Sequence, residues 1–177
     1  MIHSPLGLIH TLAASSALIV GAIVFFRPKA GILHRRLGYA YTLAMIITIF
    51  TAFMIYRLTG KANILHLAAL VSGLTLGNGL WHVFQRRNDG KWFEKHFKAM
   101  SSSYLGLLAA FFAETATRIG MPYLQEKGMA SFGWFWSIIG IVSFLIIFVG
   151  MKVLKAKQPR LEKYRPKATS NNQEETV

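Results

Sequence analysis

The sequence predicts an all-α fold: an integral membrane bundle of five transmembrane helices, with the N-terminus outside the cell and the C-terminus inside. Two observations lead to this prediction. The chain has 177 residues, 53% of them hydrophobic, and its apolar residues gather in five stretches of about 20, the length that crosses about 30 Å of hydrocarbon. Its cations gather in alternate gaps between these stretches, as in membrane proteins of fixed orientation.

Each stretch is expected to be helical, because lipid offers no hydrogen-bond partner to an unpaired backbone group. The stretches cover residues 6–26, 37–56, 64–84, 100–119 and 132–154. The first stretch is longer than the apolar region of a signal peptide, and residues 1–5 before it contain no Lys or Arg. We therefore interpret it as a retained helix. The serines Ser101, Ser102 and Ser103 favour the start of the fourth helix. The fifth ends at Leu154, where apolar periodicity stops.

The orientation follows from sixteen of the 20 lysines and arginines. Four lie in residues 27–36, five in residues 86–98 and seven in residues 152–167. The opposite side carries Arg57, Lys61, Arg118 and Lys127. The positive-inside rule then places the N-terminus outside. Residues 1–155 form one transmembrane domain, and residues 156–177 form a cytoplasmic tail, basic and then polar, that is predicted to be disordered.

The composition also limits the chemistry and the partners. The chain has no cysteine, which excludes disulfides, iron–sulfur clusters, thiolate zinc sites and cysteine nucleophiles. The net charge of +13 comes from short clusters beside the spans, so we expect anionic lipids at the inner face and no nucleic acid. The small-residue pairs Ala17 with Gly21 and Gly73 with Gly77 let helices approach closely, either in a homodimer or, as we favour, within the bundle.

Four ionisable residues are predicted to share one layer near the outer face. At about 1.5 Å per helical residue, His10 and His66 lie just inside the outer ends of their spans, and Glu114 and Arg118 lie near the outer end of the fourth. An ionisable group inside a membrane is costly and indicates function by default. The alternative is structural, because Glu114 and Arg118 are one turn apart and suited to an i, i+4 ion pair.

A second set of histidines, His34, His82 and His96, is predicted at the inner face. The first functional hypothesis is haem b, held by one histidine from each of two helices. His10 and His66 would hold an outer haem, and His34 and His96 an inner one, which would let electrons cross the membrane. His66 and His82 are 16 residues apart, about 160° around a helix, so they face opposite ways. Glu114 and Arg118 would handle a proton or a haem propionate.

Two alternatives stay open at this point, and with them the question whether the chain is an enzyme. A zinc ion on His34, His82 and His96, with Asp89 or Glu94 as a base, would make a membrane hydrolase. The chain has no H-x-x-H or H-x-x-x-H spacing, which such histidine boxes use. The third hypothesis is a carrier or structural membrane protein whose ionisable residues only pack and pair. No catalytic residue, substrate or redox partner is identified.

Three segments carry a resemblance to a known family: KAGILHRRLGYAYTLAM (residues 29–45), NILHLAAL (63–70) and HFKAMSSSYLGLLAAFFAETATR (96–118). They resemble domain of unknown function 2306, a family of bacterial multi-pass membrane proteins, and the likeness covers roughly residues 8–118. It implies a bacterial plasma membrane location. It also gives weight to His10, His34, Arg35, His66, His96, Ser103, Tyr104, Glu114 and Arg118. His82 lies outside the signature, and Ala30 stands where the family's loop usually has glycine.

Overall fold

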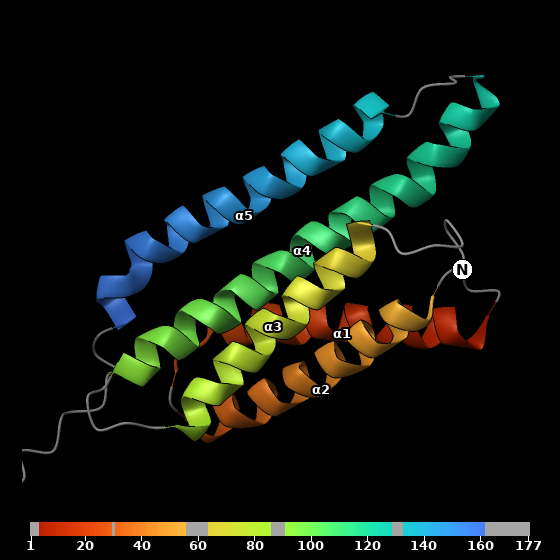
Figure 1. Cartoon of the computed structure of the whole chain (residues 1–177). Helices are drawn as coiled ribbons and strands as arrows, with labels where there is room; N and C mark the ends of the chain where they lie inside the picture. The colour runs from red at the N-terminus through yellow and green to blue at the C-terminus, as the bar shows by residue number, and fades with distance from the viewer. Residues whose placement is uncertain (1–3, 30, 56–63, 86–90, 129–132, 162–177) are drawn as a thin grey trace, which may run out of the picture.

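The computed structural model describes residues 4–29, 31–55, 64–85, 91–128 and 133–161, and these residues form five helices and no strand (Figure 1). The helices are α1 (Pro5–Phe26), α2 (Ile32–Met54), α3 (Ile64–Phe84), α4 (Lys91–Glu126) and α5 (Gly133–Leu161). The predicted all-α membrane bundle is confirmed.

The helix boundaries differ from the predicted spans where helices continue past the hydrocarbon. α2 begins at Ile32 rather than at residue 37, and α4 begins at Lys91 rather than at residue 100. α5 continues to Leu161, inside the segment predicted as a tail, of which residues 162–177 lie outside the described part. Hydropathy marks only the part of a helix that needs lipid, whereas backbone hydrogen bonds continue into the head-group region.

The ends of α1 have clear local causes. The Ser4 hydroxyl accepts a hydrogen bond of 3.2 Å from the Gly7 N–H, and Pro5 occupies the first turn, where its missing N–H costs nothing. At the other end, Lys29 Nζ donates to the carbonyl oxygens of Val24 and Phe25. A cation there also suits the negative end of the helix dipole.

α4 is the central element. It contacts α1, α3 and α5, while α2 packs between α1 and α3. In the part of the chain that is described, α5 packs on α4 alone, and Figure 1 shows it lying along α4, apart from α1 and α2.

The central position explains an unusual property of α4. Four of the described helices, α1, α2, α3 and α5, are long and apolar enough to cross a membrane by length and composition, and α4 is not among them. Ser101, Ser103 and Thr117 of α4 are buried among its neighbours. A helix surrounded by protein does not need an apolar surface on every side.

The core lies where the first four helices meet, at Ala17, Tyr41, Met45, Leu76 and Leu107. Ala17 and Gly21 of α1 are both buried, so this small-residue pair packs internally, as favoured above. A Cβ atom at Gly21 would lie 2.5 Å from the Tyr104 ring, so only glycine lets α4 approach α1 here. Gly73 lies 3.9 Å from Ile49 by the same measure, and Gly77 has no neighbour within 4 Å.

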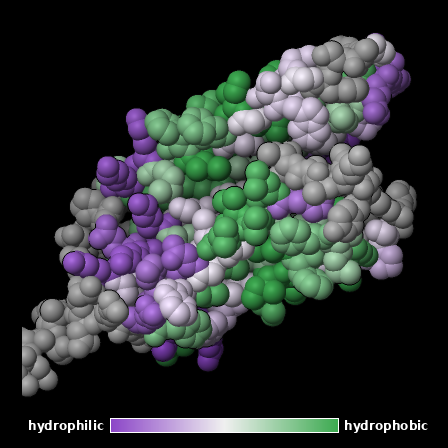
Figure 2. Space-filling model, viewed as in Figure 1, coloured by the Kyte–Doolittle hydropathy of each residue, from purple (hydrophilic) through white to green (hydrophobic). Residues whose placement is uncertain are grey.

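The charges are unequal between the two ends of the bundle. The end where α1 finishes and α2 and α4 begin carries exposed cations, and hydrophilic residues gather there while apolar residues cover the middle (Figure 2). These cations are Arg27, Arg35, Arg36, Lys91, Lys95, Lys98, Lys152 and Lys155. We call this the inner end, following the positive-inside rule.

Candidate functional site

Two cavities lie between the helices, and a pair of histidines lines each of them. His10 of α1 and His66 of α3 line the first, which we call the outer cavity. His34 of α2 and His96 of α4 line the second, the inner cavity. The structure therefore brings together both histidine pairs that the sequence predicted, and each pair comes from two different helices.

The outer cavity has a free volume of about 90 Å³, within a hollow of about 810 Å³ that includes its open mouth. Most of its wall is apolar, with Met45, Ile49, Leu107 and Phe111 among its residues. Polar groups come from all four surrounding helices: His10, Thr48, His66, Ser72 and Glu114. A mostly apolar wall with a few polar groups is typical of small-molecule sites.

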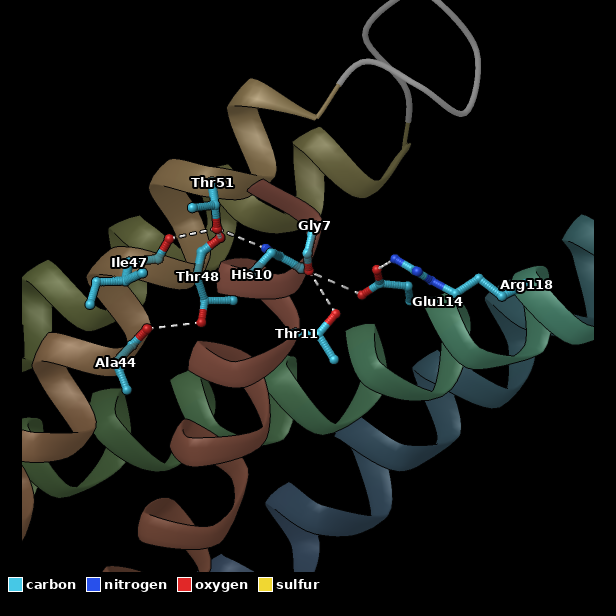
Figure 3. A network of polar contacts seen from close by, with 9 residues as sticks. All are labelled: Gly7, His10, Thr11, Ala44, Ile47, Thr48, Thr51, Glu114 and Arg118. Carbon is cyan, nitrogen blue, oxygen red and sulfur yellow. Dashed lines mark hydrogen bonds and ion pairs between the residues drawn. The ribbon is translucent and has the colours of Figure 1, made fainter. Parts of the chain in front are cut away.

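His10 is held by α2 through Thr51. Its side chain is buried, and its Nδ1 lies 2.9 Å from the Thr51 hydroxyl (Figure 3). That hydroxyl donates its one hydrogen to the carbonyl oxygens of Ile47 and Thr48, at 2.7 and 3.1 Å. With its hydrogen on one of these carbonyls, the hydroxyl can only accept from His10, which favours a proton on Nδ1. Nε2 is left to face the other side.

The other side of His10 faces a carboxylate of α4. Nε2 of His10 lies 3.7 Å from Oε2 of Glu114, and the other carboxylate oxygen pairs with Arg118 (Figure 3). The predicted i, i+4 pair is therefore present. The 3.7 Å distance between His10 and Glu114 is longer than a hydrogen bond, and Arg118 already neutralises the carboxylate through its other oxygen.

The inner cavity has a free volume of about 70 Å³, within a hollow of about 540 Å³ that includes its open mouth, and its wall is also mainly apolar. His96 Nδ1 donates to the Gly79 carbonyl oxygen at 2.8 Å, since a carbonyl can only accept. Its Nε2 therefore keeps a lone pair when the ring is neutral. Burial lowers the pKa of His96, which lies before the predicted span, although its bond to Gly79 acts in the opposite direction. His34 Nδ1 is buried with no hydrogen-bond partner among the described residues.

Three further residues define the surroundings of the inner histidines. Lys29 lines the cavity while it caps α1, and burial lowers the pKa of its ammonium group. Tyr104 also lines it and donates to the Leu18 carbonyl oxygen at 3.3 Å. Tyr41 lies 3.1 Å, oxygen to oxygen, from the fully buried Ser103. The signature residues Ser103 and Tyr104 thus hold the helices around this cavity.

Other predicted residues lie elsewhere. His82 sits in the last turn of α3 and is not part of the inner-cavity wall, and Arg35 is exposed on α2. Within the described ranges, no three His, Asp or Glu side chains are placed to hold a metal ion together. The three-histidine zinc group is therefore not assembled. Asp89, its proposed base, falls outside the described residues, and Glu94 is exposed on α4.

Sequence reasoning missed the residues that position the histidines: Thr51 for His10, the Gly79 carbonyl for His96, and Lys29 beside His34. The sequence gives only a weak signal that Thr51 contacts His10. Thr48 and Thr51 each bond to a carbonyl one turn earlier, as threonines commonly do in membrane helices, so their types do not distinguish them.

Comparison with known proteins supports the resemblance. No curated protein and no solved structure matches the chain. A family model described as "Predicted membrane protein (DUF2306)" matches residues 7–155, which cover α1 from Gly7, all of α2, α3 and α4, and α5 as far as Lys155. The chain therefore belongs to the DUF2306 family of membrane proteins.

Proposed function

We propose that this protein binds haem b and moves electrons within the membrane, and that its inner cavity holds the haem between His34 and His96. One observation carries the proposal: two histidines from different helices line one apolar cavity inside a helical bundle. Haem sites in bundles are built in this way, from side chains on facing helices.

The chemistry of the inner cavity fits this cofactor. His96 has its Nδ1–H bonded to a backbone carbonyl, which fixes the ring and leaves Nε2 as a donor atom, the usual arrangement of metal-binding histidines. His34 contributes a buried ring nitrogen that lacks a hydrogen-bond partner in the described structure. Phe93, Phe97 and Met100 supply apolar and aromatic wall suited to a porphyrin.

When bound, haem supplies one-electron oxidation and reduction. The chain's own residues would hold the haem iron through two imidazoles and exclude water from the haem. They would also fix the distance between the haem and the outer half of the bundle. Lys29 adds positive charge at the cavity wall, which favours an anionic propionate. The location we propose is the bacterial plasma membrane, with the exposed cations of the inner end against anionic lipid head groups.

The second haem, on His10 and His66, stays a prediction. Both residues line the outer cavity, but each ring nitrogen of His10 already faces a partner, Thr51 on one side and Glu114 on the other. Ligation by His10 would require its Nε2 to leave Glu114. The zinc hydrolase, the carrier and the homodimer also stay predictions, and metal analysis tests the first of them.

The test is an absorption spectrum of the full-length protein, purified after expression with ample haem. We expect a Soret band and reduced α and β bands in the wild type, and loss of at least half the bound haem in His34→Ala and His96→Ala. His82→Ala is the matched control, because His82 is at the same end but not in the cavity wall, and it should keep its haem. A wild type without Soret absorbance would remove the proposal.

A further inference from the structure

A third hollow lies at the inner end of the bundle, where α1 ends and α2 begins. We call it the junction pocket, and its wall includes Val24, Arg27, Lys29, Leu33, His34 and Leu37. Its free volume of about 190 Å³ is larger than that of either histidine cavity, so a group of several atoms fits inside it. The pocket lies at the depth where phospholipid head groups meet the protein, because α1 and α2 cross the hydrocarbon.

The wall of the junction pocket combines apolar side chains with cations. Val24, Leu33 and Leu37 form its apolar part, and Arg27 and Lys29 carry the positive charge. Immediately outside this wall, the apolar side chains at positions 26 and 32 are exposed, at the end of α1 and the start of α2. Basic pockets between membrane helices on the inner side are typical binding sites for the head groups of anionic lipids.

The two cations of the pocket lack a counter-charge. In the described part of the chain, no acidic side chain pairs with Arg27 or Lys29, and none is in the pocket wall. Lys29 Nζ donates to the carbonyl oxygens of Val24, Phe25 and Arg27, which fixes the ammonium group but leaves its charge. Burial lowers the pKa of Lys29, because a charge partly removed from water is costly. An anion in the pocket would reduce this cost.

The start of α2 adds a smaller contribution of the same sign. Gly31, Leu33 and His34 of its first turn line the pocket, and Gly31 provides no side-chain cap for the free N–H groups. These groups and the helix dipole favour a negative charge beside them. The pocket therefore suits an anion, and a zwitterionic head group would bring its own cation to a wall without an acidic residue.

We propose that the junction pocket binds the phosphate group of an anionic phospholipid from the inner leaflet. Arg27 is the main contact, because its planar guanidinium group can donate to two phosphate oxygens at once. Lys29 contributes its charge, since its hydrogens are already donated to carbonyl oxygens. The acyl chains of the lipid lie beside Phe26 and Ile32, which are exposed to the membrane. The pocket needs no haem for this role.

The first experiment measures the unfolding temperature of the full-length protein in detergent after addition of a lipid. Dioleoylphosphatidylglycerol should raise it by about 5 °C more than dioleoylphosphatidylcholine does, because only the first brings a net negative charge. Arg27→Gln should lose at least half of this difference. Arg36→Gln is the matched control and should keep it, because it removes the same charge at an exposed position outside the pocket wall. Inorganic phosphate at the same concentration should have little effect, because it lacks the acyl chains.

The second experiment counts bound dioleoylphosphatidylglycerol by native mass spectrometry, which does not depend on stability. The wild type and Arg36→Gln should retain one lipid molecule at a collision energy that removes it from Arg27→Gln. Equal retention in all three proteins would overturn the proposal, as would an equal stabilisation by the two lipids. Stabilisation by inorganic phosphate as large as that by the anionic lipid would also overturn it, because the ligand would then be a free anion.

Discussion

Nε2 of His10 lies 3.7 Å from Oε2 of Glu114, so α1 and α4 meet through two ionisable side chains inside a membrane bundle. Each of the two has a further partner: the Thr51 hydroxyl of α2 contacts His10, and Arg118 of the same helix pairs with Glu114. Such groups are rare in membrane helices because an unpaired charge there is costly. Three helices, α1, α2 and α4, thus position these two side chains.

Arg118→Met should destabilise the protein more than Glu114→Gln does. The first change leaves a carboxylate without its cation, and the second leaves a cation that can extend toward water. Because both side chains are about a quarter exposed, we expect a cost of about 1–2 kcal/mol for Arg118→Met, below the 3–5 kcal/mol typical of fully buried pairs. Unfolding in detergent measures it. If the double variant lost as much as the sum of the single ones, the pair would be uncoupled.

Thr51→Val should loosen His10. Valine keeps the shape but cannot accept the Nδ1–H, which leaves a buried donor without a partner and costs about 1–2 kcal/mol. Thr42→Val is the control: Thr42 also donates to a carbonyl one turn earlier, that of Gly38, but it lies away from the cavity on the same helix. The His10 imidazole signal in ¹⁵N NMR should change tautomer pattern in Thr51→Val alone. An unchanged signal would contradict the assigned proton position.

Gly21→Ala should weaken the bundle although alanine favours helices. A Cβ at residue 21 would lie 2.5 Å from the Tyr104 ring, and overpacking of this kind costs about 1–3 kcal/mol, against a gain of about 1 kcal/mol in helix propensity. Gly77→Ala meets no atom within 4 Å and should be neutral or slightly stabilising. Thermal unfolding of the two variants compares them directly. Equal behaviour would show that α1 and α4 are not in close contact.

Acidification should destabilise the fold through His96. Burial lowers its folded pKa below the ordinary value of 6.5. As the pH falls below 6.5, the unfolded chain binds a proton that the folded protein binds only at a lower pH, so stability decreases in that window. The unfolding temperature measured between pH 7.5 and 5.5 should fall less steeply in His96→Gln than in the wild type. Parallel curves would mean that another group causes the decrease.

Depth along a helix, and the angle between two residues of one helix, could be predicted from the sequence, but which side chains of neighbouring helices meet could not. Counting residues from the span ends placed His10, His66 and Glu114 in one layer, and all three line the outer cavity. The sequence places His66 and His82 on opposite sides of their helix. In agreement, His66 lines the outer cavity, whereas His82 is not in the inner-cavity wall. Which threonine faces His10 depends on how α1 and α2 pack, and no local pattern in the sequence contains that information.

The ends of the helices also differ between the prediction and the structure. The predicted span 100–119 covers the middle of α4, which in the structure begins earlier, at Lys91, and carries His96 in this extension. The apolar run of the sequence ends at the lipid boundary, but the helix continues, because its backbone hydrogen bonds do not depend on lipid. That extension places His96 against the Gly79 carbonyl of α3, a contact that the predicted span 100–119 does not include.

The most direct test of the haem site is the electron paramagnetic resonance spectrum of the oxidised protein. We expect a low-spin ferric signal from two imidazole ligands, which changes to high-spin, or disappears with the haem, in His34→Ala and in His96→Ala. His82→Ala should keep the low-spin signal. A low-spin signal that survives both substitutions would contradict the assignment of His34 and His96, and with it the account of how this bundle works.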